Sequence, residues 1–286
     1  MKVVVTGASG FVGRHVVTAL IARGHDVTAV SRALRETAPW TGSARQIALD
    51  LHDPSIDPVS LIGTPDLLIH LAWPGLPNYR GLFHIDRNLP DDCRFLRRMV
   101  DAGLPRLLVT GTCFEYGMQD GALAEDSPTL PDNPYGVAKN TLRLYLQSLC
   151  SEQAFSLQWA RLFYLHGPGQ NPNSLLAQLD AAIDRGDEVF PMSGGEQLRD
   201  YLPVADAAAL LVRLAESPNA QGVFNCCSGA PVSVRRLVEQ RLRERGASMQ
   251  LELGRYAYPD YEPFAFWGVR KRLDDLHGSS AILHEA

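Results

Sequence analysis

Short apolar runs alternate with stretches of helical periodicity along most of this 286-residue chain. Residues 3–5 are all valine, and the apolar positions that follow recur at helical spacing: Val12, Val16, Val17 and Leu20. A run of β-branched residues is typical of a strand covered on both faces, and the second spacing is typical of an amphipathic helix. The first 22 residues therefore predict a strand, a tight turn and a helix.

The same alternation continues towards the middle of the chain. Further strands are predicted over residues 25–31, 46–49, 66–72 and 106–112, and helices over residues 86–102 and 135–150. Strands that alternate with helices form a parallel sheet with right-handed crossovers, and ligands bind at the carboxyl ends of its strands. We therefore predict an α/β fold built on a Rossmann-like doubly wound parallel sheet.

The second half of the chain is less regular. Residues 167–195 hold several prolines and glycines around a short helix over 175–185, which indicates that the chain leaves the sheet there to build a lid. Helices over residues 203–217 and 233–246 and a strand over 223–227 complete the pattern. The aromatic segment from Arg255 is expected to close over a ligand, and residues after Gly278 to form a frayed end.

Composition and charge argue against several classes of protein, namely those that bind nucleic acids, membranes or metals. A formal charge of −5 offers no basic surface for nucleic acid or anionic membranes. The chain enters a strand at once and has no apolar run near the roughly 20 residues of a membrane span, so we expect a cytoplasmic protein without a signal peptide. The five scattered cysteines favour free thiols, and the eight histidines lack metal-ligand spacing, so no metal site is predicted.

The predicted turn after the first strand carries Gly7, Gly10 and Gly13. Glycines at such a turn let a diphosphate approach the backbone, and the helix N-terminus that follows offers free N–H groups and partial positive charge. The spacing is Gly-x-x-Gly-x-x-Gly, and a loop that only turns the chain is the alternative. Because the loop joins a strand directly to a helix, we interpret it as a dinucleotide-binding loop.

The second predicted strand ends at Ser31 and Arg32, where many dinucleotide folds carry an acid. An acidic side chain there holds the ribose 2′-hydroxyl, whereas an arginine pairs with a 2′-phosphate. This favours NADP(H) over NAD(H) as the cofactor. A solvated arginine at the strand end is the alternative, and Arg35 could share the role.

These observations divide the chain in two. We predict an NADP-binding Rossmann domain over residues 1–165, to which residues 198–226 return. A smaller α/β C-terminal region, residues 166–197 and 227–286, is expected to bind the substrate.

Asn133 and Pro134 open the predicted helix that places Tyr135 and Lys139 on one face, one turn apart. An ammonium group near a phenol favours phenolate, so it lowers the tyrosine pKa from about 10 towards neutrality. Such a tyrosine can transfer a proton to a carbonyl oxygen. A surface pair is the common alternative at this spacing, but Thr112 ends the fifth strand at the sheet edge that carries the glycine loop, which favours a catalytic site.

Six motifs in order make the chain resemble the extended short-chain dehydrogenase/reductases, in particular the branch that acts on nucleotide-linked sugars. They are TGASGFVG at residues 6–13, HLAW at 70–73, GTCFEYG at 111–117, YGVAK at 135–139, RLFYLHGPG at 161–169 and LRDYLPVAD at 198–206. The resemblance covers nearly the whole chain and implies the same fold and a nicotinamide cofactor.

The resemblance also implies roles for single residues. Thr112 would hydrogen-bond the reacting oxygen, Tyr135 would be the acid/base, and Lys139 would tune it and bind the nicotinamide ribose. The residues expected to bind the cofactor are Gly7, Ser9, Gly10, Phe11, Val12, Gly13, Ser31, Arg32, Asp50 and Leu51 (near the adenine), Leu71, Ala72, Tyr135 and Lys139. The candidate substrate-binding residues are Trp73, Thr112, Tyr164, Asn173 and Arg199 (on the diphosphate), with plain packing or turn formation as the alternative for Trp73, Tyr164 and Asn173.

Two departures from the family pattern narrow the reaction. Sugar-nucleotide 4,6-dehydratases carry an Asp-Glu pair directly after the catalytic threonine, where this chain has Cys113 and Phe114. Fucose-synthase-like epimerase reductases carry a cysteine two residues after the serine or threonine and a histidine soon after the Gly-Pro, where this chain has Phe114 and Gly169. The resemblance thus implies simple hydride transfer at a carbonyl.

Our hypothesis is NADPH-dependent reduction of a nucleotide-diphosphate 4-keto-6-deoxyhexose or a close keto-sugar relative. The resemblance further implies a homodimer paired through the helices that begin near Asp86 and Tyr135. A nucleotide-sugar 4-epimerase with retained NAD is one alternative. A non-catalytic NADP-binding regulator is the other, since a fold alone does not fix a function.

Overall fold

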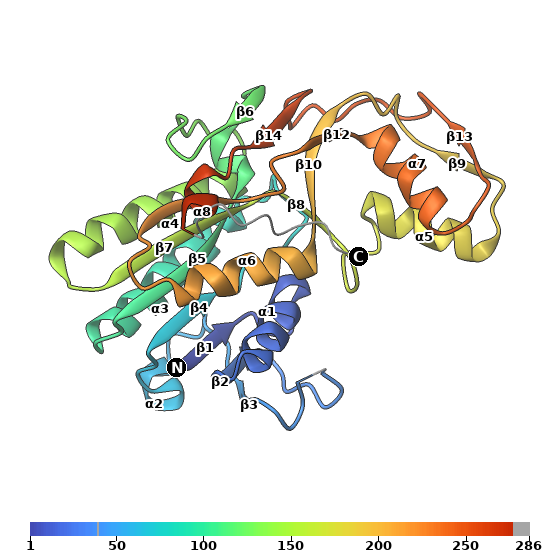
Figure 1. Cartoon of the computed structure of the whole chain (residues 1–286). Helices are drawn as coiled ribbons and strands as arrows, with labels where there is room; N and C mark the ends of the chain where they lie inside the picture. Colours follow the sequence, from blue (N-terminus) through green and yellow to red (C-terminus); the bar gives the residue numbers. More distant parts are fainter. Residues whose placement is uncertain (39, 277–286) are drawn as a thin grey trace.

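The computed structural model describes residues 1–38 and 40–276 and has a seven-stranded parallel sheet at its centre (Figure 1). The strand order is β11-β7-β5-β4-β1-β2-β3, so the chain starts in the middle of the sheet and winds outward in both directions. The strands are β1 (Lys2–Thr6), β2 (Asp26–Ser31), β3 (Arg45–Ala48), β4 (Leu67–His70), β5 (Arg106–Thr112), β7 (Ser156–Leu162) and β11 (Gly222–Cys226). This confirms the predicted Rossmann-like doubly wound sheet.

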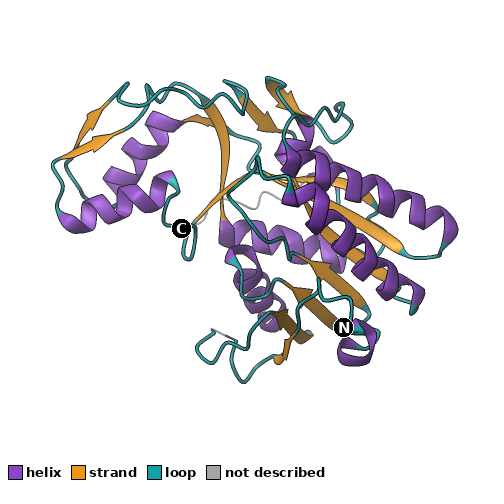
Figure 2. Ribbon diagram, turned by 180° about the vertical axis from the view of Figure 1, so that it is seen from behind, coloured by secondary structure: helices purple, strands orange, loops and turns teal. Residues whose placement is uncertain are grey.

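Helices cover both faces of this sheet (Figure 2). One face carries α1 (Phe11–Ala22) and α6 (Val204–Glu216), and the other carries α2 (Pro58–Ile62), α3 (Leu89–Asp101) and α4 (Pro134–Glu152). Successive side chains of a strand point to opposite faces, so Val3 and Val5 pack beneath α1 while Val4 packs on the other side. The valine run of β1 therefore contributes to two apolar cores.

Two predicted helices begin later than the sequence indicated. The helix expected from residue 86 begins at Leu89, because His84–Asn88 first forms a π-helical turn, η1. The helix expected from residue 203 begins at Val204, because β10 (Leu198–Pro203) runs up to it. The helix opened by Asn133 begins as predicted, since the Asn133 side-chain oxygen accepts a hydrogen bond from the Gly136 N–H at 2.9 Å.

A smaller lobe projects away from the main sheet, at the right of Figure 1. It packs Leu179 and Val238 from two helices against Phe190 and Met192. Its elements are α5 (Leu175–Arg185), α7 (Val234–Glu244), β9 (Val189–Pro191) and β13 (Gln250–Glu252). A three-stranded sheet lies between the lobe and the main sheet and consists of β8 (Tyr164–His166), β10 and β12 (Pro231–Ser233). The four elements of the lobe lie within the predicted smaller α/β region, residues 166–197 and 227–286, whereas β10 falls among the residues predicted to return to the main domain.

The last described segment returns to the main sheet. Strand β14 (Phe266–Gly268) pairs with β6 (Gly121–Leu123), and helix α8 (Lys271–Asp275) lies against β11, where Arg272 donates to the Val223 carbonyl at 2.6 Å. These elements span three and five residues, which is too short to produce a periodicity. The predicted two-part domain division stays a prediction, and the expected frayed end after Gly278 lies outside the described residues. No helix in the described ranges combines the length and the apolar character needed to cross a membrane.

Candidate active site

The loop between β1 and α1 packs its backbone tightly against neighbouring chain. Gly7 has a φ of +70°, and a Cβ built on it would lie 2.7 Å from the backbone nitrogen of Ala72. A Cβ on Gly13 would lie 2.1 Å from the Gly7 carbonyl oxygen. Within the described residues no side chain caps α1 at Gly10, so its first N–H groups remain available to a ligand. The loop therefore fits the phosphates of a dinucleotide, and its remaining predicted contacts, Ser9, Phe11 and Val12, are half-buried beside it.

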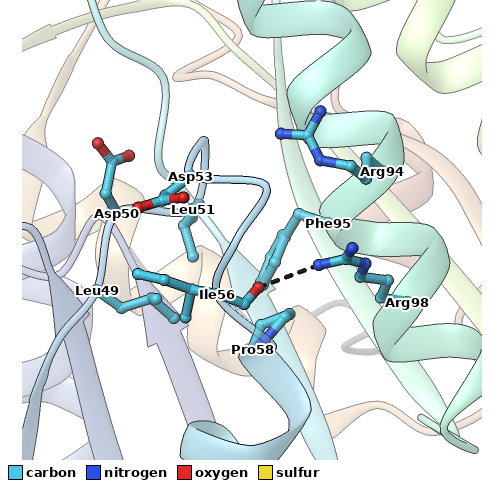
Figure 3. A pocket seen from close by; sticks show the side chains of 9 residues that line it. All are labelled: Leu49, Asp50, Leu51, Asp53, Ile56, Pro58, Arg94, Phe95 and Arg98. Atoms are coloured by element: carbon cyan, nitrogen blue, oxygen red, sulfur yellow. Dashed lines mark hydrogen bonds between the residues drawn. The ribbon is translucent and has the colours of Figure 1, made fainter.

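A pocket lies between the loop after β3 and helix α3 (Figure 3). Its walls are held together by Arg98, which donates to the Ile56 carbonyl at 3.0 Å. The pocket is lined by Leu49, Asp50, Leu51, Asp53, Ile56, Pro58, Arg94, Phe95 and Arg98. Asp50 and Leu51, the two residues expected near the adenine, therefore line one narrow pocket with apolar neighbours. Their contact with the cofactor stays a prediction.

The carboxyl end of β2 exposes Arg32. In the part of the chain that the structure describes, its guanidinium group has no hydrogen-bond acceptor and no carboxylate partner. Ser31 donates through Oγ to the Ala33 carbonyl at 2.7 Å, and the Arg35 N–H donates to Gln46 Oε1 at 3.0 Å. The predicted position for a 2′-phosphate is therefore open to solvent and carries a free cation.

Thr112 ends β5 and opens the 3-10 turn η2 (Cys113–Tyr116). The Phe114 N–H donates to Thr112 Oγ1 at 3.3 Å, and the Thr112 N–H donates to Glu115 Oε1 at 2.9 Å, which completes a capping box. Glu115 is fully buried and also accepts a hydrogen bond from Arg161 at 2.8 Å. The carboxylate therefore supports the turn from inside the protein.

Tyr135 lies in the first turn of α4, is 7% exposed and faces inward. Its ring centroid is 5.2–6.2 Å from the centroids of four others: His84, Tyr79, Trp73 and Phe114. Burial and the neighbouring Tyr79 raise the pKa of the Tyr135 phenol, and its hydrogen bond with Thr112 only partly opposes that rise. The expected lowering of this pKa by Lys139 is therefore wrong for this structure, where the phenol holds its proton tightly.

Lys139 lies one turn further along α4 and is 2% exposed. Its Nζ donates to the Thr110 carbonyl at 3.0 Å and sits 4.0 Å from the ring centroid of Trp73. Burial lowers the Lys139 pKa to about 8, although the charges of Asp92 and Glu115 oppose that shift. The ammonium group is thus held by a carbonyl and a ring face.

Trp73 is half-buried and packs beside Tyr135 and Lys139. Its Nε1 donates to His84 Nδ1 at 3.0 Å, and His84 Nε2 lies 2.7 Å from the Asn78 carbonyl oxygen. Its ring also stands edge-on to Tyr135, with the ring planes 62° apart. The candidate role of Trp73 as a substrate contact stays a prediction.

Arg199 is buried and already has an anionic partner. Its guanidinium donates to Glu262 Oε1 at 2.8 Å and to the carbonyl oxygens of Leu198 and Phe264 at 2.8 and 2.9 Å. The Tyr164 hydroxyl donates to the other oxygen of Glu262. Two candidate substrate residues, Arg199 and Tyr164, therefore meet at a carboxylate from the C-terminal segment.

The structure brings the three predicted catalytic side chains together but leaves one candidate substrate residue apart. Asn173 is exposed in the turn before α5. Its N–H donates to Asn171 Oδ1 at 2.8 Å, and its carbonyl accepts from Gln178 at 2.6 Å. These contacts are those of a turn, which was the alternative reading of this residue.

A buried polar chain runs behind the glycine loop. Thr6 Oγ1 lies 2.9 Å from His70 Nδ1, His70 Nε2 lies 3.2 Å from Asp92 Oδ2, and Asp92 Oδ1 lies 3.3 Å from His52 Nε2. Burial alone would raise the pKa of Asp92, but the two histidines lower it to about 2. Among the described residues, no set of histidine, cysteine and acidic side chains is arranged to hold a metal ion.

Three residues of the site were not predicted from the sequence: Tyr79, His84 and Glu262. Tyr79 accepts the Tyr135 N–H through its carbonyl at 3.2 Å. All three lie in loops or in the π-helical turn, where no periodic pattern marks a residue as inward-facing. The aromatic composition after Arg255 was the one available signal for Glu262, since it indicated a segment that closes over a ligand.

Comparisons with known proteins agree with this geometry. A family model described as "NAD dependent epimerase/dehydratase family" matches residues 3–227. A relative from Aggregatibacter actinomycetemcomitans, dTDP-6-deoxy-L-talose 4-dehydrogenase (NAD(+)), is 31% identical over 94% of this chain and 100% of its own length. Another protein of that organism, GDP-6-deoxy-D-talose 4-dehydrogenase, is 27% identical over 84% of this chain and 78% of its own length.

The fold is also found among solved structures. MoeE5 in complex with UDP-glucose and NAD superposes with a TM-score of 0.85 at 29% sequence identity. The match covers 99% of this chain and 94% of that one, so it includes both the main sheet and the smaller lobe.

Proposed function

This chain belongs to the NAD dependent epimerase/dehydratase family, and from that premise we propose that it reduces the 4-keto group of a nucleotide-diphosphate 4-keto-6-deoxyhexose. The proposal rests mainly on one observation: the side chains of Thr112, Tyr135 and Lys139 are buried close together at the carboxyl end of β5. That end of the sheet also carries the glycine loop, which suits a dinucleotide.

The names of the relatives support chemistry at this position of the sugar. Both Aggregatibacter proteins are named as 4-dehydrogenases of a nucleotide-linked 6-deoxytalose. Dehydrogenation at C4 and reduction of a 4-keto group are the two directions of one reaction. The substrate class that we propose is therefore the oxidised form of the sugars in those names.

The side chains of the cluster have complementary parts in such a reduction. The Thr112 hydroxyl accepts from the Phe114 N–H and is hydrogen-bonded to the Tyr135 phenol, so both hydroxyl groups lie where one substrate oxygen could bind. Tyr135 transfers its phenolic proton to that oxygen, and the nearby charge of Lys139 stabilises the phenolate that remains. When bound, a nicotinamide cofactor supplies the hydride that the carbonyl carbon receives.

Burial raises the pKa of the Tyr135 phenol, so its proton is present for transfer to the alkoxide oxygen that develops at C4 during reduction. In the reverse reaction the same residue would act as the base, so the assay below decides which direction predominates.

We propose NADP(H) as the preferred cofactor, because the guanidinium group of Arg32 at the end of β2 is free to pair with a 2′-phosphate. The relatives point the other way, since one is named with NAD(+) and the MoeE5 structure holds NAD. A direct comparison of the two cofactors in the assay below decides between these arguments.

One assay tests the reaction. NADPH or NADH oxidation is followed against UDP-, dTDP-, GDP- and CDP-linked 4-keto-6-deoxyhexoses, with mass spectrometry of the product. We expect one cofactor oxidised per sugar and a product two hydrogens heavier. Interconversion of the C4 epimers of a 4-hydroxy nucleotide sugar, with a retained NAD and no net consumption, would identify a 4-epimerase instead. Cofactor binding without turnover of any keto or hydroxy sugar would identify a non-catalytic protein.

We also propose a homodimer that forms through α3 and α4. Leu144 on α4 is 49% exposed, which leaves an apolar side chain for a second copy to cover. Light scattering coupled to size exclusion should give a mass of two chains, and charged substitution of Leu144 should shift it towards one.

A further inference from the structure

Trp73 covers the ammonium group of Lys139 with the face of its indole ring, at 4.0 Å from the ring centroid. A cation over an aromatic face is attracted by the ring quadrupole, and the attraction is strongest where water is excluded. Lys139 is 2% exposed, so little water competes for its charge. The indole face is therefore a direct contact of the ammonium group, in addition to the Thr110 carbonyl.

A hydrogen bond at the edge of the indole ring fixes the orientation of Trp73. Trp73 donates to His84 Nδ1 at 3.0 Å, and His84 Nε2 lies 2.7 Å from the Asn78 carbonyl oxygen. This pattern requires a neutral His84 with its proton on Nε2, because Nδ1 must accept. Burial lowers the His84 pKa and the charge of Lys139 adds to that shift, so the neutral ring is the stable form.

The charged groups that face Lys139 are engaged elsewhere. Asp92 on α3 and Glu115 on η2 raise its pKa through their charges. Asp92 is held by two buried histidines, and Glu115 by a buried arginine and an indole. His84 on η1 is neutral, and Tyr135 on the same helix keeps its proton. The Trp73 ring face and the Thr110 carbonyl are thus the two close contacts that favour the charged form.

We propose that Trp73 is a positioning residue, whose ring holds the ammonium group of Lys139 in place and stabilises its charged form, with His84 setting the angle of the ring. The proposal rests on the proposed function, because it assigns Lys139 its part in the reaction. Without the ring, the hydrogen bond to the Thr110 carbonyl would be the remaining close contact of the ammonium group. Because the group would still be buried, it would lose its proton at lower pH.

The lysine content of the chain allows a direct test. The sequence has three lysines, Lys2, Lys139 and Lys271, so each can be titrated separately by NMR of protein labelled with ¹³C at lysine Cε. Lys2 and Lys271 are exposed and serve as internal references. The measurement uses the protein without cofactor or sugar, so it does not depend on finding the substrate.

Variants of Trp73 separate the ring face from simple bulk. W73L keeps apolar volume and removes the face, so the Lys139 midpoint should fall by about one pH unit. W73F keeps a face and loses the N–H, so the midpoint should fall by less than half as much. W267L on β14 is the matched tryptophan control and should leave it unchanged. A midpoint that stays in place in W73L, or falls equally in W73F, overturns the proposal.

His84 supplies a second route if W73L does not fold, which circular dichroism would reveal. H84L removes the acceptor of the indole N–H and should lower the Lys139 midpoint. H84N keeps an acceptor near the Nδ1 position and should restore most of it, and an equal shift in H84L and H84N counts against the proposal.

The role of Trp73 and the proposed reduction are tested by different measurements. In the active enzyme, the alkaline limb of kcat/KM should move with the NMR midpoint of Lys139. Turnover of a keto sugar together with an unmoved midpoint in W73L overturns the role of Trp73 alone. A moved midpoint without turnover of any sugar overturns the proposed reaction alone.

Discussion

Arg199 and Glu262 lie 63 residues apart in the chain and form a buried ion pair, with Arg199 Nη2 2.8 Å from Glu262 Oε1. Arg199 is the cation expected to meet the diphosphate of a sugar nucleotide. In this structure a carboxylate from the C-terminal segment takes that place, and removal of one ion from such a pair leaves the other buried without a partner. A diphosphate that bound Arg199 would therefore have to displace Glu262 or share the guanidinium with it.

Replacing Glu262 by glutamine should increase the affinity for the sugar nucleotide. Glutamine keeps an acceptor oxygen for Arg199 but removes the competing negative charge, so KM should fall by up to about tenfold, the equivalent of about 1.4 kcal/mol. Steady-state kinetics at saturating cofactor measure this. E196Q is the matched control, because Glu196 also accepts from a tyrosine hydroxyl, that of Tyr258, but is exposed. A higher KM in E262Q would mean that Glu262 itself binds the substrate.

Replacing Tyr135 by phenylalanine should remove turnover and spare cofactor binding. The variant lacks the proton donor, so kcat should fall by about 10²- to 10⁴-fold, while calorimetric titration of NADPH should give a nearly unchanged Kd. Y145F, on the same helix and outside the aromatic cluster, is the control and should keep wild-type kcat. Retained activity in Y135F would leave the proposed mechanism without its acid.

His52 should contribute to stability chiefly at acid pH. Its hydrogen bond with Asp92 raises the His52 pKa despite partial burial. The resulting stabilisation is fully present below the pKa of histidine in the unfolded chain, about 6.5, and is lost as pH rises through the higher folded value. The free energy of unfolding of H52Q should therefore fall below wild type by about 1.5–3 kcal/mol at pH 5 and approach it at alkaline pH.

Urea unfolding across this pH range measures the effect. H15Q is the control, because His15 contacts the Pro168 carbonyl rather than a carboxylate. A difference between H52Q and wild type that does not change with pH would show that the ring acts by packing alone.

Arg32 should set the preference between the two cofactors. Loss of a charged contact with a 2′-phosphate in R32A should lower kcat/KM for NADPH by about tenfold to a hundredfold and leave the value for NADH nearly unchanged. R35A is the matched control and should have the smaller effect. Equal effects of R32A on both cofactors would assign Arg32 to solvent and favour NAD, as in the named relative.

A methyl group at Gly13 should abolish cofactor binding. In G13A the new Cβ would lie 2.1 Å from the Gly7 carbonyl oxygen, so the loop must deform at a cost of about 1–3 kcal/mol. G24A tests strain without a clash: Gly24 has a φ of +77°, and among the described residues no atom lies within 4 Å of its added Cβ. Both variants should be less stable, but fluorescence titration with NADPH should find binding lost in G13A alone.

The sheet and the first turns of its helices could be predicted because their signals are local. The valine run of β1, the three glycines and the Asn133 cap each lie within a few residues of the structure they specify. Tyr135 and Lys139 could be paired for the same reason, since helical spacing places them on one face. The glycine loop and the strand end at Thr112 then favoured a catalytic site over a surface pair.

The partners of these residues could not be predicted, because tertiary packing joins distant segments. Trp73 meets Lys139 from the loop after β4, and Glu262 meets Arg199 from a segment with no periodicity. The predicted direction of the pKa shift of Tyr135 was wrong for a related reason. Spacing indicated a nearby ammonium group, but the direction of the shift depends on the burial of the phenol and on the second ring, Tyr79.

The close approach of Gly13 to the Gly7 carbonyl has a consequence for the kinetics of cofactor capture. A loop that packs on its own backbone has its binding shape before any ligand arrives, so association loses little chain entropy there. If the cofactor binds as we propose, its exchange should be governed by the contacts at its two ends, at Arg32 and at Lys139, while the loop between them stays rigid.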